Sequence, residues 1–178
     1  MTTQKHALML MMAFIPINAM AADWRTFTDP EGIFSFDAPL DVHVARQAGT
    51  RPDGITMQTR VFSYGANKPG ELACAVTETE YGSSVDLAED TPKTMAATIK
   101  SQLQTLHVQA DVDTPVTVDG RNGWRLEFKD LKGNGVAFRW FVVRNRLFQL
   151  ICTTPPNASA AEKEETAQVA NSFRFLAR

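Results

Sequence analysis

This chain has few cysteines and histidines, and its net charge is small. Its 178 residues include two cysteines and three histidines, and the formal net charge is −2. Two cysteines exclude a disulfide-rich miniprotein and a zinc site built from four cysteines. The near-balanced charge excludes a basic nucleic-acid binder. Because 44% of the residues are apolar, the composition is that of a globular protein rather than a disordered one, and the length indicates one domain.

Long apolar runs are also missing. The run at residues 7–17 is shorter than the roughly 20 residues that span a bilayer. It follows Lys5 and precedes Ala19-Met20-Ala21, which is the three-part pattern of a secretory signal peptide. We therefore expect a signal peptide at residues 1–21, a single mature domain at residues 22–178, a periplasmic or secreted location, and no stable membrane insertion after cleavage. An uncleaved membrane anchor is the alternative.

Motifs of known catalytic or binding sites are absent from the sequence. Residues 82–85 lack the Gly-x-Ser-x-Gly pattern of a nucleophile elbow. No glycine-rich nucleotide loop, His-x-x-x-His or Cys-x-x-Cys motif occurs. We accordingly predict no catalytic residue, no cofactor and no metal ligand, and we expect a protein that is not an enzyme.

Alternating apolar and polar residues predict most of the secondary structure. A hairpin is expected at Trp24–Phe36, with residues 42–47 extending its second strand, and a long strand pair follows. Further predicted strands are Ile55–Tyr64, Leu72–Tyr81, Trp124–Lys129, Val136–Arg144, Leu147–Thr153 and a closing segment at Ser172–Leu176. The opening third of the mature chain is thus predicted to be an antiparallel meander.

Two helices are predicted between and after these strands. The first begins with Thr91 as N-cap and Pro92 in the first turn, and ends near His107. Its apolar stripe requires a sheet beneath it. The second begins at a Ser159–Glu162 capping box and runs to about Asn171. The predicted fold class is α+β: a mostly antiparallel twisted sheet flanked by two long helices.

Several segments resemble the PsbP-like family. Residues 27–39 resemble its opening hairpin, residues 118–128 the strand pair after the first helix, residues 142–150 the next hairpin, and residues 172–175 its closing segment. The resemblance implies a PsbP-like α/β/α sandwich, the fold of an extrinsic oxygen-evolving-complex protein shared with a Ran-binding nuclear-import factor and bacterial secreted proteins. It implies accessory or binding roles and no catalytic site.

Acidic residues gather in one stretch of the sequence. They are Glu78, Glu80, Asp86, Glu89 and Asp90. We interpret them as a possible acidic surface patch, which could bind a divalent cation weakly or dock a basic partner. A solvated strand end and loop explain the same residues without any ligand.

Both cysteines lie inside predicted strands and on the apolar parity of those strands. Cys74 shares its face with Leu72 and Val76, and Cys152 shares its face with Phe148 and Leu150. An oxidising compartment favours a bridge between them if their strands are neighbours. Two buried free thiols are the alternative, because the sequence does not reveal strand order.

The functional expectation is a periplasmic accessory or binding protein that acts through its surface on a protein partner, for example as an immunity protein or chaperone, with no nucleic-acid partner. The alternatives are a hydrolase with an unrecognised site and a weak divalent-metal-binding carrier. A cleft lined by convergent, strongly perturbed titratable groups would favour the hydrolase. A flat or groove-like apolar surface would favour partner binding.

Overall fold

The computed structural model describes residues 24–39, 41–65 and 72–177. The predicted signal peptide at residues 1–21 lies outside the described residues. The elements, in chain order, are β1 (Arg25–Thr28), β2 (Phe34–Ala38), β3 (His43–Thr50), β4 (Thr56–Gly65), β5 (Ala73–Tyr81), α1 (Thr91–Thr105), β6 (Ala110–Val118), β7 (Arg121–Lys129), β8 (Gly135–Val143), β9 (Arg146–Thr154), α2 (Ala160–Ser172) and β10 (Arg174–Phe175).

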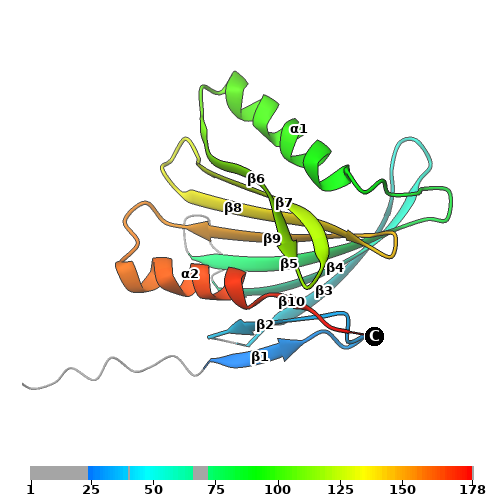
Figure 1. The fold of residues 1–178 in the computed structure, drawn as a ribbon, viewed down its shortest axis with the longest axis horizontal. Helices are drawn as coiled ribbons and strands as arrows, with labels where there is room; N and C mark the ends of the chain where they lie inside the picture. Colours follow the sequence, from blue (N-terminus) through cyan, green and yellow to red (C-terminus); the bar gives the residue numbers. More distant parts are fainter. Residues whose placement is uncertain (1–23, 40, 66–71, 178) are drawn as a thin grey trace, which may run out of the picture.

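A large antiparallel sheet forms the centre of the molecule (Figure 1). Its strand order in the described residues is β3-β4-β5-β9-β8-β7-β6. The two hairpin systems of the sequence, β3–β5 and β6–β9, therefore meet where β5 pairs with β9. That junction joins residues far apart in the chain, so the alternation within each strand could not predict it.

A second, smaller sheet has the order β1-β2-β10. The predicted opening hairpin is present, with Phe27 opposite Phe36. The prediction that residues 42–47 extend its second strand is wrong, because the chain crosses to the large sheet and begins β3 at His43. The opening third is thus a hairpin in one sheet followed by a meander in the other.

Helix α1 covers the end of the large sheet formed by β6, β7 and β8. The helix begins at Thr91 with Asp90 as N-cap and ends at Thr105. The prediction of Thr91 as N-cap is wrong by one position, whereas the predicted end near His107 lies within two residues of the observed end. Ala96 and Leu103 are buried against the sheet, whereas Leu106 lies beyond the helix and is half exposed.

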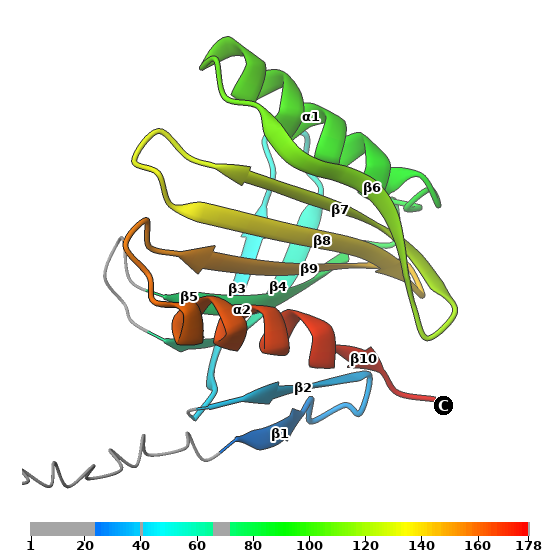
Figure 2. The same ribbon diagram turned by 60° about the vertical axis from the view of Figure 1, so that its left-hand side comes forward.

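Helix α2 lies on the opposite face, between the large sheet and the β1–β2 hairpin (Figure 2). The predicted capping box is confirmed: Ser159 Oγ accepts from the Glu162 N–H, and the Glu162 carboxylate accepts from the Ser159 N–H. The α+β class and the antiparallel sheet are confirmed. The helices have 15 and 13 residues, so the prediction of two long flanking helices is not.

The alternation of apolar and polar residues did not predict strand β6, and only the family resemblance implied a strand ending near residue 118. It carries two aspartates and Pro115, which are residues that rarely occur in strands. The strand forms an edge of the large sheet. Proline is tolerated at an edge because one side of the backbone there has no neighbouring strand to bond.

Two apolar cores lie on the two faces of the large sheet. Four aromatic residues of β7 and β8 pack under α1: Trp124, Phe128, Phe138 and Trp140. Phe148 packs on the other face, with Phe62 and Phe141. In that second core, Phe34 of the small sheet has its ring within 5.1–6.3 Å of four other phenylalanine rings, those of Phe36, Phe62, Phe148 and Phe173. The small sheet is thus held to the large one by aromatic packing.

Among the described residues, neither helix is long and apolar enough to cross a membrane.

Glu165 of α2 is expected to make the stability of the domain depend on pH. Burial, and then the charge of Glu162, raises the pKa of the Glu165 carboxyl. A carboxyl whose pKa is raised in the folded state binds more protons folded than unfolded, so stability falls as the pH rises from the unfolded value through the folded one. We expect Glu165→Gln to unfold at a higher temperature than the parent at pH 7.

The difference in unfolding temperature should shrink as the pH falls toward about 4.5, the ordinary pKa range of a glutamate, and should vanish below it, because Glu165 is then protonated in both states. Glu164→Gln is the matched control, since it removes one negative charge from an exposed position of the same helix. A Glu165→Gln advantage that stays constant from pH 4 to pH 8 would contradict this explanation.

Candidate functional site: a groove beside the second helix

Cys74 and Cys152 form a disulfide in the structure. They occupy directly opposite positions of β5 and β9, with their Cα atoms 4.1 Å apart. Both are at least 97% buried in the core on the α2 face. The shared parity with Val76 and Leu150 therefore pointed to the right face, and the pairing of β5 with β9 makes the bridge possible. Cys152 also lies in the floor of the groove described below.

The five acidic residues do not form one surface patch. Glu80 is exposed on β5, and Asp86, Glu89 and Asp90 are exposed in the loop before α1 and at its start. Glu78 is only 2% exposed, so its assignment to a surface patch is wrong. In the described part of the chain, no three His, Cys, Asp or Glu side chains are placed to hold a metal ion together.

Glu78 is buried because two arginines neutralise it. Arg60 of β4 stands opposite it in register and bonds its carboxylate, and Arg146 Nη1 lies 2.6 Å from Glu78 Oε1. Arg60 Nη1 also contacts Asp29 and Glu31, at 3.1 and 3.0 Å, in the β1–β2 turn. This buried charge network therefore links the small sheet to the large one and stabilises their association.

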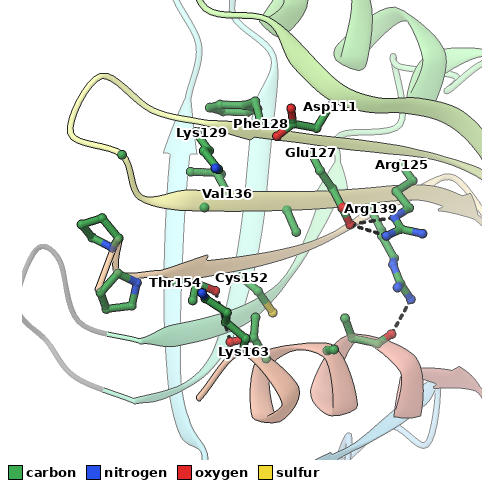
Figure 3. A pocket seen from close by; sticks show the side chains of 18 of the residues that line it. Asp111, Arg125, Glu127, Phe128, Lys129, Val136, Arg139, Cys152, Thr154 and Lys163 are labelled. Carbon is green, nitrogen blue, oxygen red and sulfur yellow. Dashed lines mark hydrogen bonds and ion pairs between the residues drawn. The ribbon is translucent and has the colours of Figure 1, made fainter. Parts of the chain in front are cut away.

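A hollow lined by both apolar and polar residues lies between α2 and strands β7 and β8 (Figure 3). One wall is α2, including Lys163, Ala167 and Asn171. The other wall is β7, which presents Arg125, Glu127 and Lys129 at alternating positions. The groove is open to solvent and has a volume of about 400 Å³.

Small residues of β8 keep the floor of this groove low. Gly135 and Ala137 line it, together with Gly133 of the preceding turn. Ala137 pairs with Glu127 on one side and Cys152 on the other. From Gly135 to Arg139 the strand advances about 13 Å at roughly 3.3 Å per residue, so the floor matches about four residues of an extended chain.

The end of the groove near Gly133 is held by a rigid turn. The Asp130 carboxylate accepts hydrogen bonds from the Lys132 and Asn134 N–H groups, at 2.8 and 2.9 Å, and from the Asn134 amide. The Asn134 side-chain bond is the main cause of the lowered pKa of Asp130. The turn therefore stays ordered by its own contacts, and the groove is pre-formed at this end.

The opposite end is built around Arg139. Its guanidinium donates to the Ala170 carbonyl and, at 2.9 Å, to Asn171 Oδ1, at the C-terminal end of α2. A cation is favoured there by the helix dipole and by the free carbonyls of the last turn. Burial, followed by the charge of Arg125, lowers the pKa of Arg139.

Sequence reasoning missed this groove. The strand alternation placed Arg125 and Lys129 on the polar face of β7, but nothing marked that face as one wall of a hollow. Asp111 reaches the groove from a β-bulge in β6, where the pairing shifts between Ala110 and Val112, and β6 itself was not predicted. The alternation of polar and apolar residues along β7 was the only feature of the sequence that pointed toward this wall of the groove.

Comparison with solved structures identifies the fold. The chain resembles the solution structure of cyanobacterial PsbP (CyanoP) from Synechocystis sp. PCC 6803, with a TM-score of 0.57 and 15% identity over 89% of this chain and 95% of that one. No protein-family model matches the chain, and no curated protein does. At this identity the likeness shows that the fold is PsbP-like.

Proposed function

We propose that this chain is an exported accessory or binding protein that receives a short extended segment of a protein partner in the groove beside α2. The observation behind the proposal is the groove itself: a floor of small residues between a helix and a strand, pre-formed at one end by the Asp130 turn and open to solvent. A segment of about four residues matches its length.

The proposed location rests on two features. The pattern of residues 1–21 is that of a signal peptide, and the Cys74–Cys152 disulfide is typical of proteins that work in oxidising compartments. The PsbP-like fold supplies no specific function, so the partner has to come from the chemistry of the groove.

Binding is favoured over hydrolysis by the composition of the groove. Of the described residues that line it, none is serine or histidine, and the cysteine belongs to the disulfide. Glu127 accepts from Arg125 at 2.7 Å, so this carboxylate is already paired with a cation. These side chains therefore offer no serine or cysteine nucleophile paired with a histidine base.

Filling the groove should abolish partner binding while leaving the fold intact. Ala137→Trp puts a large side chain on the floor, where Ala137 is half-buried and faces the hollow. We expect the exported protein, carrying a photo-crosslinker at the exposed position 167 of α2, to crosslink to one defined partner. The yield of this crosslink should fall at least tenfold when the Ala137→Trp substitution is also present.

Ala97→Trp on the exposed side of α1 is the matched control, since it makes the same change on the other side of the large sheet. Circular dichroism and the unfolding temperature verify that both variants fold. Equal capture in the parent and in a folded Ala137→Trp protein would show that the groove does not hold the partner.

A further inference from the structure

The charged side chains of the groove are predominantly basic, although the whole chain has a net charge of −2. Four cations line it against two carboxylates: Arg125, Lys129, Arg139 and Lys163 against Asp111 and Glu127. One of the carboxylates, that of Glu127, is bonded to Arg125. The groove therefore has an excess of positive charge that the described residues lining it do not neutralise.

Two arginines stand directly opposite each other on its floor and wall. Arg125 of β7 and Arg139 of β8 are register partners. Like charges in such cross-strand positions repel each other. Glu127 bonds Arg125 directly, whereas the guanidinium of Arg139 donates to neutral oxygens of α2. A bound anion next to this pair would relieve the repulsion further.

The two lysines extend the positive charge along the groove. The ammonium groups of Lys129 and Lys163 make no hydrogen bond or ion pair with another described residue. Figure 3 shows them on opposite walls, with the β8 floor between them. Both are exposed, so an occupant of the groove could contact them from two sides.

The carboxylates in the lining favour a peptide over a nucleic acid. Asp111 and Glu127 would repel the phosphate backbone of a nucleic acid, whose charge repeats at every nucleotide. A peptide presents acidic side chains and neutral or donating backbone groups in alternation, and can place each opposite its complement.

Building on the proposed function, we infer that the segment bound beside α2 is acidic, with Asp or Glu side chains placed between Lys129 and Lys163 and next to the Arg125–Arg139 pair. Recognition of carboxylates by this cationic groove sets the chemical class of partner: a protein with an exposed, extended acidic stretch. We expect the affinity of the groove for that stretch to depend on its charge and its length and not otherwise on its sequence.

The test uses a fluorescein-labelled tetraglutamate peptide and the mature, disulfide-bonded protein, with binding followed by fluorescence anisotropy. A charge contact at 4 Å in water is worth about 1 kcal/mol, or roughly fivefold in affinity. We expect Lys129→Gln and Lys163→Gln each to weaken binding about fivefold, and the double variant about 25-fold. Binding should be strong at about 10 mM salt and lost at about 1 M, where the Debye length falls from about 30 to about 3 Å.

Lys93→Gln on α1 is the matched control and should leave the affinity unchanged, because this exposed lysine lies on the other side of the large sheet. Three results would overturn the inference. They are a loss of tetraglutamate affinity in Lys93→Gln equal to that in the groove variants, a tetraglutamate affinity that does not change with salt concentration, or tighter binding of a thymidine tetranucleotide than of tetraglutamate.

The crosslinking experiment at position 167 separates the two levels of the proposal. If the Lys129→Gln/Lys163→Gln protein captures its partner as well as the parent does, while Ala137→Trp does not, the groove is a binding site and its acidic specificity is wrong. If Ala137→Trp also captures normally, the proposed function fails as well.

Discussion

Replacing both cysteines with alanine should lower the free energy of unfolding by about 4 kcal/mol, the value that the chain-entropy model gives for a loop of this size. Cys74 and Cys152 are 78 positions apart in the sequence. The bridge therefore restricts a large part of the unfolded chain, and its removal restores that freedom to the unfolded state. The free energy is measured by urea unfolding of the mature protein without reductant.

Two further measurements separate this effect from a loss of packing. In the presence of a strong reductant, the parent and the Cys74→Ala/Cys152→Ala protein should differ by much less, because both then lack the bridge. Counting thiols in the denatured, unreduced mature protein should give none. Two reactive thiols per chain would contradict the bridge directly.

Substituting Glu78 with glutamine should destabilise the domain by about 3 kcal/mol, because removing one partner of a buried ion pair leaves the other charges uncompensated. Arg60 and Arg146 both bond this carboxylate, and its side chain is 3% exposed. For a chain of this size, the loss corresponds to a fall of roughly 6–12 °C in the unfolding temperature.

Glu80→Gln is a closely matched control. Glu80 lies two positions along the same strand and contacts the same Arg146, at 3.1 Å, but its side chain is 54% exposed. An exposed pair contributes about 0–1 kcal/mol, so this variant should unfold close to the parent. If both glutamine variants lost the same stability, burial would not be what makes the network matter.

The sequence predicted features that depend on local alternation, and it missed those that depend on which strands meet. The core face of Cys152 followed from its parity with Leu150, and the start of α2 from the Ser159–Glu162 box, because both patterns lie within a few residues. Glu78 has the same parity as Cys74 and Val76, but the alternation did not show which cations would neutralise it on that face. Its burial depends on Arg60 and Arg146 arriving from two other strands, and a lone glutamate in a strand pattern is read as exposed.

The groove could not be predicted from the sequence either, because it also depends on which elements meet in the fold. Its walls come from β7 and α2, its floor from β8, and Asp111 arrives through a bulge in an unpredicted edge strand. Each polar residue of β7 is ordinary by itself, since the solvent face of an antiparallel strand is usually charged. Only the position of α2 over part of that face turns it into a hollow.

Amide hydrogen exchange of the mature protein tests partner binding in the groove most directly, when it is measured with and without the partner identified by crosslinking at position 167. We expect the bound partner to slow exchange in the β7–β8 turn, at Ala137 and in the last turns of α2, with no change in α1 or β3. Protection confined to α1 or to the exposed edge strand β3 would contradict it, because the partner would then bind a face that the groove does not touch.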